Sequence, residues 1–302
     1  MSDPYVVDDP RFRFLIQGNA WLEQLHTGMR WAEGPVWLAD SQTLVWSDIP
    51  NDQLLQWGEG FGTRVFRHPA GFANGNTRDG HGRLISCSHG MRGLVRTEHD
   101  GRLTTLVDRW NGKRLNSPND ATVKSDGTVW FTDPPYGILS DYEGAKAESE
   151  IGAANVYRFD PATDELSVAA DDFERPNGIC FSPDERTLYV SDTSISHDAD
   201  GHRHIRAFDV VDGQRLANGR VFAVIEPGAS DGFRCDQDGN VWTSAGDGVH
   251  CYTPQAERLG IIRVPEAVSN VCFGGPRRNR LFITATRSLY SIFVAVNGAQ
   301  RP

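Results

Sequence analysis

Six side chains that end in an amide or carboxylate oxygen recur at similar distances ahead of short aromatic or β-branched runs. They are Glu33, Asn74, Asn119, Asn177, Asp231 and Asn270. They precede Trp46, Ile85, Trp130, Tyr189, Trp242 and Phe282, in that order, by 13, 11, 11, 12, 11 and 12 residues. If these equivalent positions converge, they form a ring of oxygens that suits a hard divalent cation. Turn chemistry alone favours Asn or Asp at the start of a strand, but it does not require an oxygen at all six positions.

The runs that follow these oxygens repeat along the whole chain. Their six anchor residues are separated by 39, 45, 59, 53 and 40 residues, and the shortest gaps are close to the length of a four-stranded propeller blade. Turn signals such as DGTVW and DGNVW precede most anchors and predict hairpins. The pattern predicts an all-β fold, a six-bladed β-propeller with four-stranded antiparallel blades. We expect one domain over residues 1–302, with 1–19 as an N-terminal extension and a strand in 20–28 that closes the last blade.

The innermost strands of a propeller line its central channel, so six equivalent strand starts are expected to meet around one axis at one face. The anchor strands return to that face, and the loops that follow them surround its mouth. The two longest such loops, 134–153 and 193–203, are expected to form a pocket wall or lid. The nearby histidines His197, His202 and His204 are interpreted as solvated, with substrate contact as the second reading and zinc binding as the third.

Composition narrows the class of partner. A formal net charge of −10 disfavours binding to nucleic acid or to anionic membranes. The five cysteines include no CxxC pair and lie mostly in apolar runs, so we expect reduced core thiols. No secretory leader or membrane-length apolar run is present, which makes the cytoplasm the expected location. No GxSxG motif indicates serine hydrolase chemistry. We expect a monomer or weak homodimer.

Four ordered motifs connect these features to a known family. They are EGPVW at 33–37, NSPNDATV at 116–123, RPNGICFSPDERTLYVSD at 175–192 and SDGFRCDQDGNVW at 230–242. Together they resemble the SMP-30/gluconolactonase/LRE-like family, and most of all its bacterial gluconolactonases. The resemblance implies a six-bladed propeller, one divalent metal ion and hydrolysis of aldono-lactones. It also implies that Glu33, Asn177 and Asp231 bind the metal, that Asn119 contacts metal or substrate, and that Asp231 is the general base.

The chain departs from related proteins at two positions. Animal members of the family have a substrate-binding arginine where this chain has Ser117, and whether Arg114 replaces it is open. The related paraoxonases have an asparagine where this chain has Gly232, which argues against a paraoxonase. The other expected substrate contacts are Asn74, His89, Tyr136 and Asn270. For His89 a polar rim, and for Tyr136 a role in pinning its loop, are the alternatives. Asn74 and Asn270 are expected to line the pocket without binding the ion.

A metal held by Glu33, Asn119, Asn177 and Asp231 would polarise the lactone carbonyl, with Asp231 taking the proton of the attacking water. Oxygen ligands favour Ca²⁺, with Mg²⁺, Mn²⁺ and Zn²⁺ as alternatives. We therefore expect a carboxylic ester hydrolase whose partner is a small sugar lactone. Hydrolysis of organophosphates or xenobiotic lactones, and a non-catalytic binding module, are the competing hypotheses.

Overall fold

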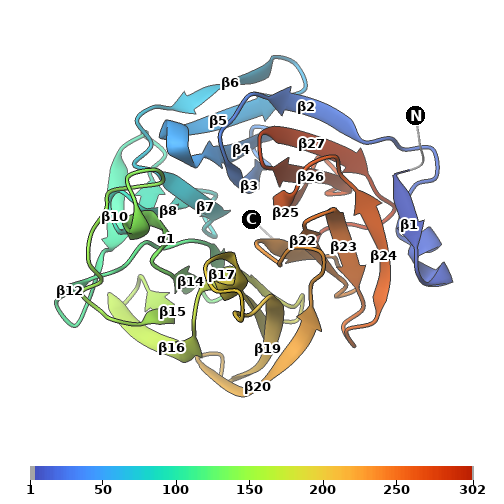
Figure 1. Ribbon diagram of the computed structural model, residues 1–302. Helices are drawn as coiled ribbons and strands as arrows, with labels where there is room; N and C mark the ends of the chain where they lie inside the picture. Colours follow the sequence, from blue (N-terminus) through green and yellow to red (C-terminus); the bar gives the residue numbers. More distant parts are fainter. Residues whose placement is uncertain (1–3, 301–302) are drawn as a thin grey trace.

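A computed structural model, which describes residues 4–300, has its strands arranged as six blades around a central axis (Figure 1). Each blade is an antiparallel sheet in which consecutive strands lie successively farther from the axis. The first contains β3 (Ala32–Leu38), β4 (Thr43–Asp48), β5 (Gln53–Gly58) and β6 (Gly62–Arg67). The second contains β7 (Ala73–Arg78), β8 (Leu84–Ser88), β9 (Gly93–Thr97) and β10 (Leu103–Val107). The third contains β13 (Ala121–Val123), β14 (Val129–Asp133), β15 (Ala154–Asp160) and β16 (Glu165–Phe173).

The remaining blades repeat this order. The fourth contains β17 (Pro176–Phe181), β18 (Thr187–Asp192), β19 (His204–Val211) and β20 (Arg215–Val224). The fifth contains β21 (Phe233–Cys235), β22 (Val241–Ala245), β23 (Gly248–Tyr252) and β24 (Arg258–Arg263). The sixth contains β25 (Val268–Gly274), β26 (Arg280–Ala285), β27 (Ser288–Phe293) and β2 (Glu23–Thr27). A two-stranded hairpin, β11 (Arg109–Trp110) and β12 (Lys113–Arg114), and the one-turn helix α1 (Tyr136–Leu139) lie between blades or within loops. The six-bladed β-propeller is confirmed.

The N-terminal part of the chain closes the ring. Strand β2 pairs antiparallel with β27, with Glu23 opposite Ser291, so the first and last parts of the chain share the sixth blade as predicted. The segment before it was expected only as an extension. In the structure, β1 (Tyr5–Val7) pairs with β24 as a fifth strand of the fifth blade. Phe12 anchors this addition, because its fully buried ring packs 6.0 Å from that of Trp242. Residues 1–3 lie outside the described part.

The anchor residues of the repeats form the core. All six lie in the second strand of a blade and are at most 4% exposed. Trp46 and Phe282 belong to one core cluster, and Trp242 packs with Phe273 at a ring distance of 6.0 Å, so both associations join residues of adjacent blades. These large side chains fill the wedge between neighbouring sheets. Packing of blade against blade therefore fixes how far each inner strand stands from the axis.

Candidate active site

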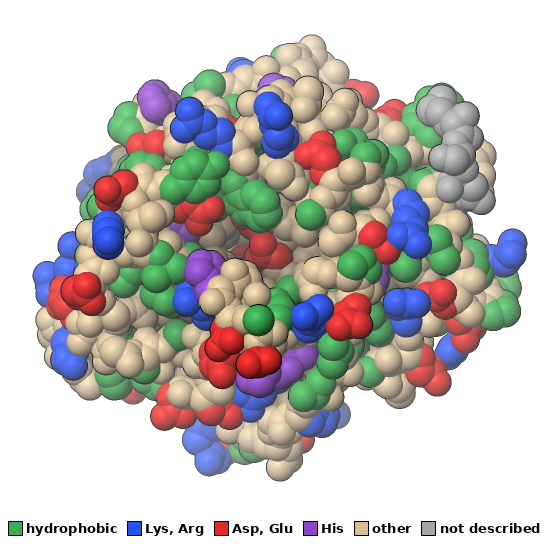
Figure 2. Space-filling view, in the orientation of Figure 1, with side chains coloured by type: hydrophobic (Ala, Val, Ile, Leu, Met, Phe, Trp, Pro, Cys, Tyr) green, Lys and Arg blue, Asp and Glu red, His purple; other side chains and the backbone are tan. Residues whose placement is uncertain are grey.

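A cavity of about 430 Å³ opens at the axis on one face of the propeller. Figure 2 shows this central hollow, with acidic side chains in its depth. Its lining includes five of the six predicted oxygen-bearing side chains, namely Glu33, Asn74, Asn119, Asn177 and Asp231. These five come from different blades, at or just before the start of the innermost strand. The repeat spacing thus correctly predicted that these five side chains meet at the axis.

Local irregularities turn these side chains toward the cavity. In four blades the pairing of the two inner strands shifts register at the oxygen position, as it does between Glu33 and Val36 and between Pro176 and Ile179. A bulge of this kind re-aims side chains at the end of a strand. Regular alternation would have pointed successive side chains into the spaces between blades instead.

Glycines let the inner strands approach one another closely. Gly75 follows Asn74, and its N–H donates to the Asn119 carbonyl of the next blade at 2.7 Å. Gly178 follows Asn177 and donates to the Asp231 carbonyl at 2.8 Å. A β-carbon at these glycines would lie 2.4 and 2.2 Å from those carbonyl oxygens, so only glycine fits. This dipeptide of oxygen-bearing residue and glycine was a sequence signal that the repeat analysis did not use.

Hydroxyl groups of the anchor strands hold the carbonyls of the same positions. Ser47 donates to the Asn74 carbonyl at 2.6 Å, and Thr132 donates to the Asn177 carbonyl at 2.7 Å. Ser191 donates to the Asp231 carbonyl at 3.0 Å. In each case the hydroxyl belongs to the blade that precedes the carbonyl. The hydrogen bonds therefore connect each oxygen-bearing residue to its neighbouring blade and fix its position around the axis.

The aspartates that end three anchor strands accept hydrogen bonds from backbone N–H groups. Asp133 accepts the backbone N–H groups of Asn116 and Ser117, both at 2.8 Å. Asp48 accepts from the N–H of Arg30 at 3.0 Å, and Asp192 from the N–H of Glu174 at 2.9 Å. Through these hydrogen bonds, each aspartate holds the segment that leads to the oxygen-bearing residue of its own blade.

Hydrogen-bond donors satisfy the carboxylates at the floor of the cavity only in part. Glu33 Oε1 is buried without a hydrogen-bond partner, while Oε2 accepts from the N–H of Gly34 and from Asn270. Burial, and then the charges of Asp231 and Asp120, raise the pKa of the Glu33 carboxyl well above its ordinary value. Burial, and then Glu143 and Asp120, raise the pKa of Asp231 to about 8, against a hydrogen bond from Asn177.

These oxygens fit a divalent cation. A buried carboxylate oxygen without a donor is costly, and a second carboxylate close by makes the charge costlier still. A hard cation would offset both, since carboxylate and amide oxygens are its preferred ligands. Among residues 4–300, no group of three or more His, Cys, Asp or Glu side chains lies together as a metal site. A cation here would therefore depend on Asn119 and Asn177 as well as on the two carboxylates.

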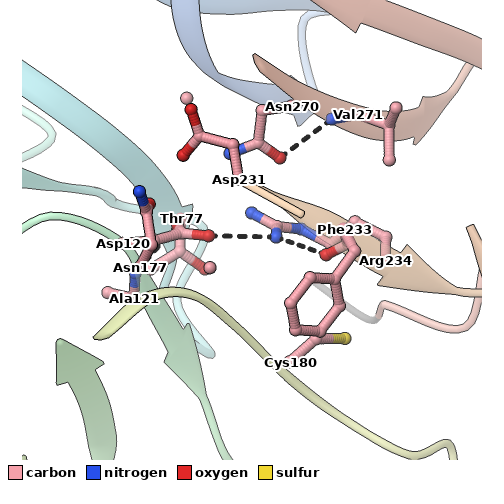
Figure 3. A network of polar contacts seen from close by, with 12 residues as sticks. Thr77, Asp120, Ala121, Asn177, Cys180, Asp231, Phe233, Arg234, Asn270 and Val271 are labelled. Atoms are coloured by element: carbon pink, nitrogen blue, oxygen red, sulfur yellow. Dashed lines mark hydrogen bonds and ion pairs between the residues drawn. The ribbon is translucent and has the colours of Figure 1, made fainter. Parts of the chain in front are cut away.

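A buried ion pair lies close to the same carboxylates. Figure 3 shows the Arg234 guanidinium between the Asp120 carboxylate and the backbone carbonyl of Phe233. Arg234 Nη1 lies 3.3 Å from Asp120 Oδ2 and 2.7 Å from that carbonyl, and both charged side chains are at most 4% exposed. Asp120 raises the pKa values of Glu33 and Asp231, and the positive charge of Arg234 beside it offsets part of this repulsion.

The walls of the cavity differ in character. Loop 134–153 contributes Tyr136, Leu139, Ser140, Tyr142 and Glu143, and loop 193–203 contributes Thr193, Ser196 and His197, so this side mixes polar and apolar groups. The opposite wall is apolar and comes from blades 1 and 6, with Trp31, Ile49, Ala267 and Val268. Both long loops thus form pocket walls, as expected. Glu143, whose pKa burial raises to about 7, was not anticipated because nothing in the sequence distinguishes it from the other loop carboxylates.

Tyr136 lines the cavity, and its hydroxyl is 2.7 Å from Thr193 Oγ1. Asn74 and Asn119 line it too, whereas Asn270, His89 and Arg114 do not. Asn270 lies behind Glu33, because its Nδ2 donates to Glu33 at 3.1 Å and its Oδ1 accepts from the N–H of Val271 at 2.8 Å. His89 is buried behind Asn74 and is not part of the lining.

Arg114 also lies away from the cavity. It is in strand β12 of the two-stranded hairpin, and its guanidinium donates to the Met91 carbonyl at 3.0 Å. Its backbone N–H donates to Glu150. Arg114 therefore does not replace the arginine that animal members of the family have at the position of Ser117. Ser117 itself is buried and donates to the Pro134 carbonyl at 2.6 Å.

Fold and site together define a six-bladed propeller with an axial pocket floored by amide and carboxylate oxygens. The chain belongs to the SMP-30/gluconolactonase/LRE-like family, whose model matches residues 31–287. It is 30% identical to the gluconolactonase of Zymomonas mobilis over 94% of this chain and 84% of the relative. It is 28% identical to the pentonolactonase XacC of Haloferax volcanii, over 85% and 82% of the two chains.

A solved structure agrees with these sequence relatives. The structure of a gluconolactonase from Xanthomonas campestris superposes with a TM-score of 0.90 and 39% identity, over 97% of this chain and 95% of that chain. The resemblance inferred from the four motifs is thereby confirmed. Within residues 4–300, no helix has the length and apolar character needed to span a membrane.

Proposed function

We propose that this protein is a divalent-metal-dependent hydrolase that opens sugar (aldono-)lactones, such as glucono-1,5-lactone, to the aldonic acid. The observation that supports it best is the convergence of five amide and carboxylate side chains on the floor of a single axial cavity. The relatives named gluconolactonase and pentonolactonase support a lactone as substrate and a carboxylic ester as the bond that is broken.

Glu33, Asn119, Asn177 and Asp231 are the proposed ligands of the cation. When bound, a divalent ion of this kind polarises the substrate carbonyl and stabilises the negative charge that develops on it. Ca²⁺ is our first choice, with Mg²⁺, Mn²⁺ and Zn²⁺ as alternatives.

Asp231 is the proposed general base that takes the proton of the attacking water. Burial and the neighbouring charges of Glu143 and Asp120 raise the pKa of its carboxyl when no cation is bound. A bound cation would favour the ionised carboxylate, which is the form that accepts a proton. Its backbone is held by Ser191 and Ser244, the latter accepting the Asp231 N–H at 2.8 Å. The backbone that carries the carboxylate is therefore held in place before substrate binds.

The two walls suit the two sides of a sugar lactone. Hydroxyl groups of the ring would face Tyr136, Ser196 and His197, while its C–H surface would lie against Trp31 and Ile49. The cavity volume of about 430 Å³ lies in the range of small-molecule sites. The apolar wall also supports the second candidate, hydrolysis of organophosphates or xenobiotic lactones at the same centre.

For location and assembly, we propose a cytoplasmic enzyme that acts as a monomer or weak homodimer. The five cysteines are all buried and unpaired, as expected in a reducing compartment.

The test is a colourimetric proton-release assay with glucono-1,5-lactone, measured above the uncatalysed background with and without EDTA. Asp231→Asn is compared with Asp200→Asn, an exposed aspartate on loop 193–203, and metal content is measured for each. Loss of a general base lowers the rate by ~10²–10⁴-fold, so Asp231→Asn should fall by this factor while Asp200→Asn stays at wild type.

Each alternative has its own outcome. Turnover that survives EDTA would contradict the metal requirement. Full activity of metal-loaded Asp231→Asn would remove Asp231 as the base. Faster turnover of an aryl phosphotriester than of any sugar lactone favours the second candidate, and binding of metal without turnover of any ester favours a binding module.

A further inference from the structure

His89 lies between Asn74 of the cavity lining and loop 134–153, the lid loop. Its ring is 1% exposed. Nδ1 lies 2.9 Å from the backbone carbonyl oxygen of Glu143, and Nε2 lies 3.4 Å from Nδ2 of Asn74. The lid also touches the face of the ring, since a β-carbon at Gly137 would lie 2.4 Å from His89 Cγ. His89 therefore contacts both the loop above the cavity and one of the side chains that line it.

The hydrogen bonds determine which nitrogen of His89 carries the proton. A carbonyl oxygen can only accept, so Nδ1 must be the protonated nitrogen. Burial lowers the pKa of the imidazole to about 4, so the ring is neutral near pH 7 and Nε2 can only accept. The Asn74 side chain must then turn its NH₂ group toward His89. The opposite orientation would place the amide oxygen against the lone pair of Nε2.

This orientation leaves Asn74 Oδ1 directed away from His89. Asn74 lines the cavity, and its Oδ1 is buried without any donor partner. A buried acceptor without a partner costs free energy, and a hydroxyl group of a bound substrate would satisfy it. If the amide were reversed, the cavity would instead present two N–H donors at this position.

We propose that His89 is a positioning residue that fixes the Asn74 amide so that its oxygen accepts a hydroxyl group of the substrate. The proposal rests on the proposed lactonase function and narrows its substrate class to lactones that carry a free ring hydroxyl. It also gives a reason for the contact of His89 with both the lid loop and Asn74. The carbonyl of Glu143 selects the His89 tautomer, and that tautomer orients Asn74.

Two substitutions separate the two contacts of the ring. The amide nitrogen of His89→Asn occupies the place of Nδ1, so this variant keeps the donor to Glu143 and loses the acceptor for Asn74. The amide of His89→Gln reaches the place of Nε2, so it keeps the acceptor. We expect His89→Asn to raise KM for glucono-1,5-lactone about tenfold with little change in kcat, the size of one lost hydrogen bond. His89→Gln should restore KM to within about threefold of wild type.

A double-mutant cycle tests whether His89 acts through Asn74. Asn74→Ala should raise KM, and adding His89→Asn to it should have no further effect. A lactone without ring hydroxyls, δ-valerolactone, should be turned over with the same KM by wild type and His89→Asn. Additive effects in the double variant, or a His89→Gln variant as impaired as His89→Asn, would overturn the proposal.

A measurement on the unmodified protein keeps the test independent of folding and of activity. The ¹⁵N shifts of the His89 ring should report a neutral imidazole protonated at Nδ1. A ring protonated at Nε2 would overturn the assignment even if the variants fail to fold. Absence of all lactone turnover would instead count against the proposed function, while the tautomer measurement would still decide how Asn74 is oriented.

Discussion

The buried ion pair of Asp120 and Arg234 offers the sharpest test of the electrostatics around the site. The change is Asp120→Asn, which keeps the shape of the side chain and removes its charge. Arg234 is 4% exposed, one of its Nη atoms has no partner, and its remaining contact would be the Phe233 carbonyl. Removing one partner of a buried pair leaves the other charge uncompensated, which costs ~3–5 kcal/mol.

The geometry places the expected loss at the lower end of that range. The pair has one contact of 3.3 Å and is not a two-pronged fork, and single contacts are weaker than bidentate ones. We therefore expect Asp120→Asn, and separately Arg234→Met, to lower the free energy of unfolding by about 3 kcal/mol. The double variant buries no charge at these positions, so it should recover to within about 2 kcal/mol of wild type.

The assay is urea unfolding followed by tryptophan fluorescence, on protein treated with EDTA at pH 7. Asp212→Asn is the control, because Asp212 pairs with Arg215 on the surface with both side chains over 70% exposed. Its loss should stay below about 1 kcal/mol. A loss below about 1 kcal/mol for Asp120→Asn, or additive losses in the double variant, would refute the reasoning.

The same variants should change cation affinity in opposite directions. Asp120→Asn removes a negative charge that acts on Glu33 and Asp231, so Ca²⁺ should bind more weakly. Arg234→Met removes a positive charge next to Asp120, so Ca²⁺ should bind more tightly. Calorimetric titration measures both, and a shift of the same sign in the two variants would show that charge is not the cause.

Three further predictions concern single residues. Glu33→Gln should stabilise the EDTA-treated protein, because it removes a buried carboxyl whose pKa is raised. The same variant should lose the ~2.7 kcal/mol of stabilisation that wild type gains at a cation concentration of 100 Kd. Melting scans with and without Ca²⁺ measure both effects. The pKa of His89 is lowered from 6.5 to about 4, so the unfolded chain takes up its proton first. The contribution of His89 to stability should then fall by about 3 kcal/mol as pH drops from 7 to 4. Urea titrations of wild type and His89→Gln at both pH values should show this contribution as their difference, because the buried carboxyls affect both proteins alike. Gly137→Ala should displace the lid loop, since the alanine β-carbon would lie 2.4 Å from His89 Cγ. Overpacking of this kind lowers the free energy of unfolding by ~1–3 kcal/mol. KM for the lactone should rise, whereas Gly18→Ala, with no atom within 4 Å, should match wild type.

The six-bladed fold and the floor of the site were predictable because both depend on a repeat. Each blade needs one large side chain, such as Trp46 or Trp130, to fill the wedge against its neighbour. A nearly constant number of residues, 11 to 13, then separates that side chain from the oxygen-bearing residue at the start of the inner strand. Counting back from the anchors therefore reached Glu33, Asn177 and Asp231 without any knowledge of the three-dimensional structure.

Features that break the repeat could not be found in this way. Strand β1 joins the fifth blade through pairing of Tyr5 with Ile262, two residues that the chain separates by nearly its full length. Glu143 reaches the cavity because the lid folds over His89, and that packing depends on Gly137. Contacts of this kind are set by how loops pack on the completed propeller, and no short pattern reports them.

By itself, the sequence determined that six oxygen-bearing side chains occupy equivalent positions around one axis, since spacing along a strand and between blades is a property of the backbone. Tertiary structure alone decided which of them face the cavity. Asn270 is turned toward Glu33, where its side chain occupies the space that a β-carbon at Gly232 would need. Asn74 has its nitrogen 3.4 Å from His89 Nε2, which leaves its oxygen directed away from that ring. An amide can turn either of two polar atoms to the same point, and only the surrounding hydrogen bonds select one.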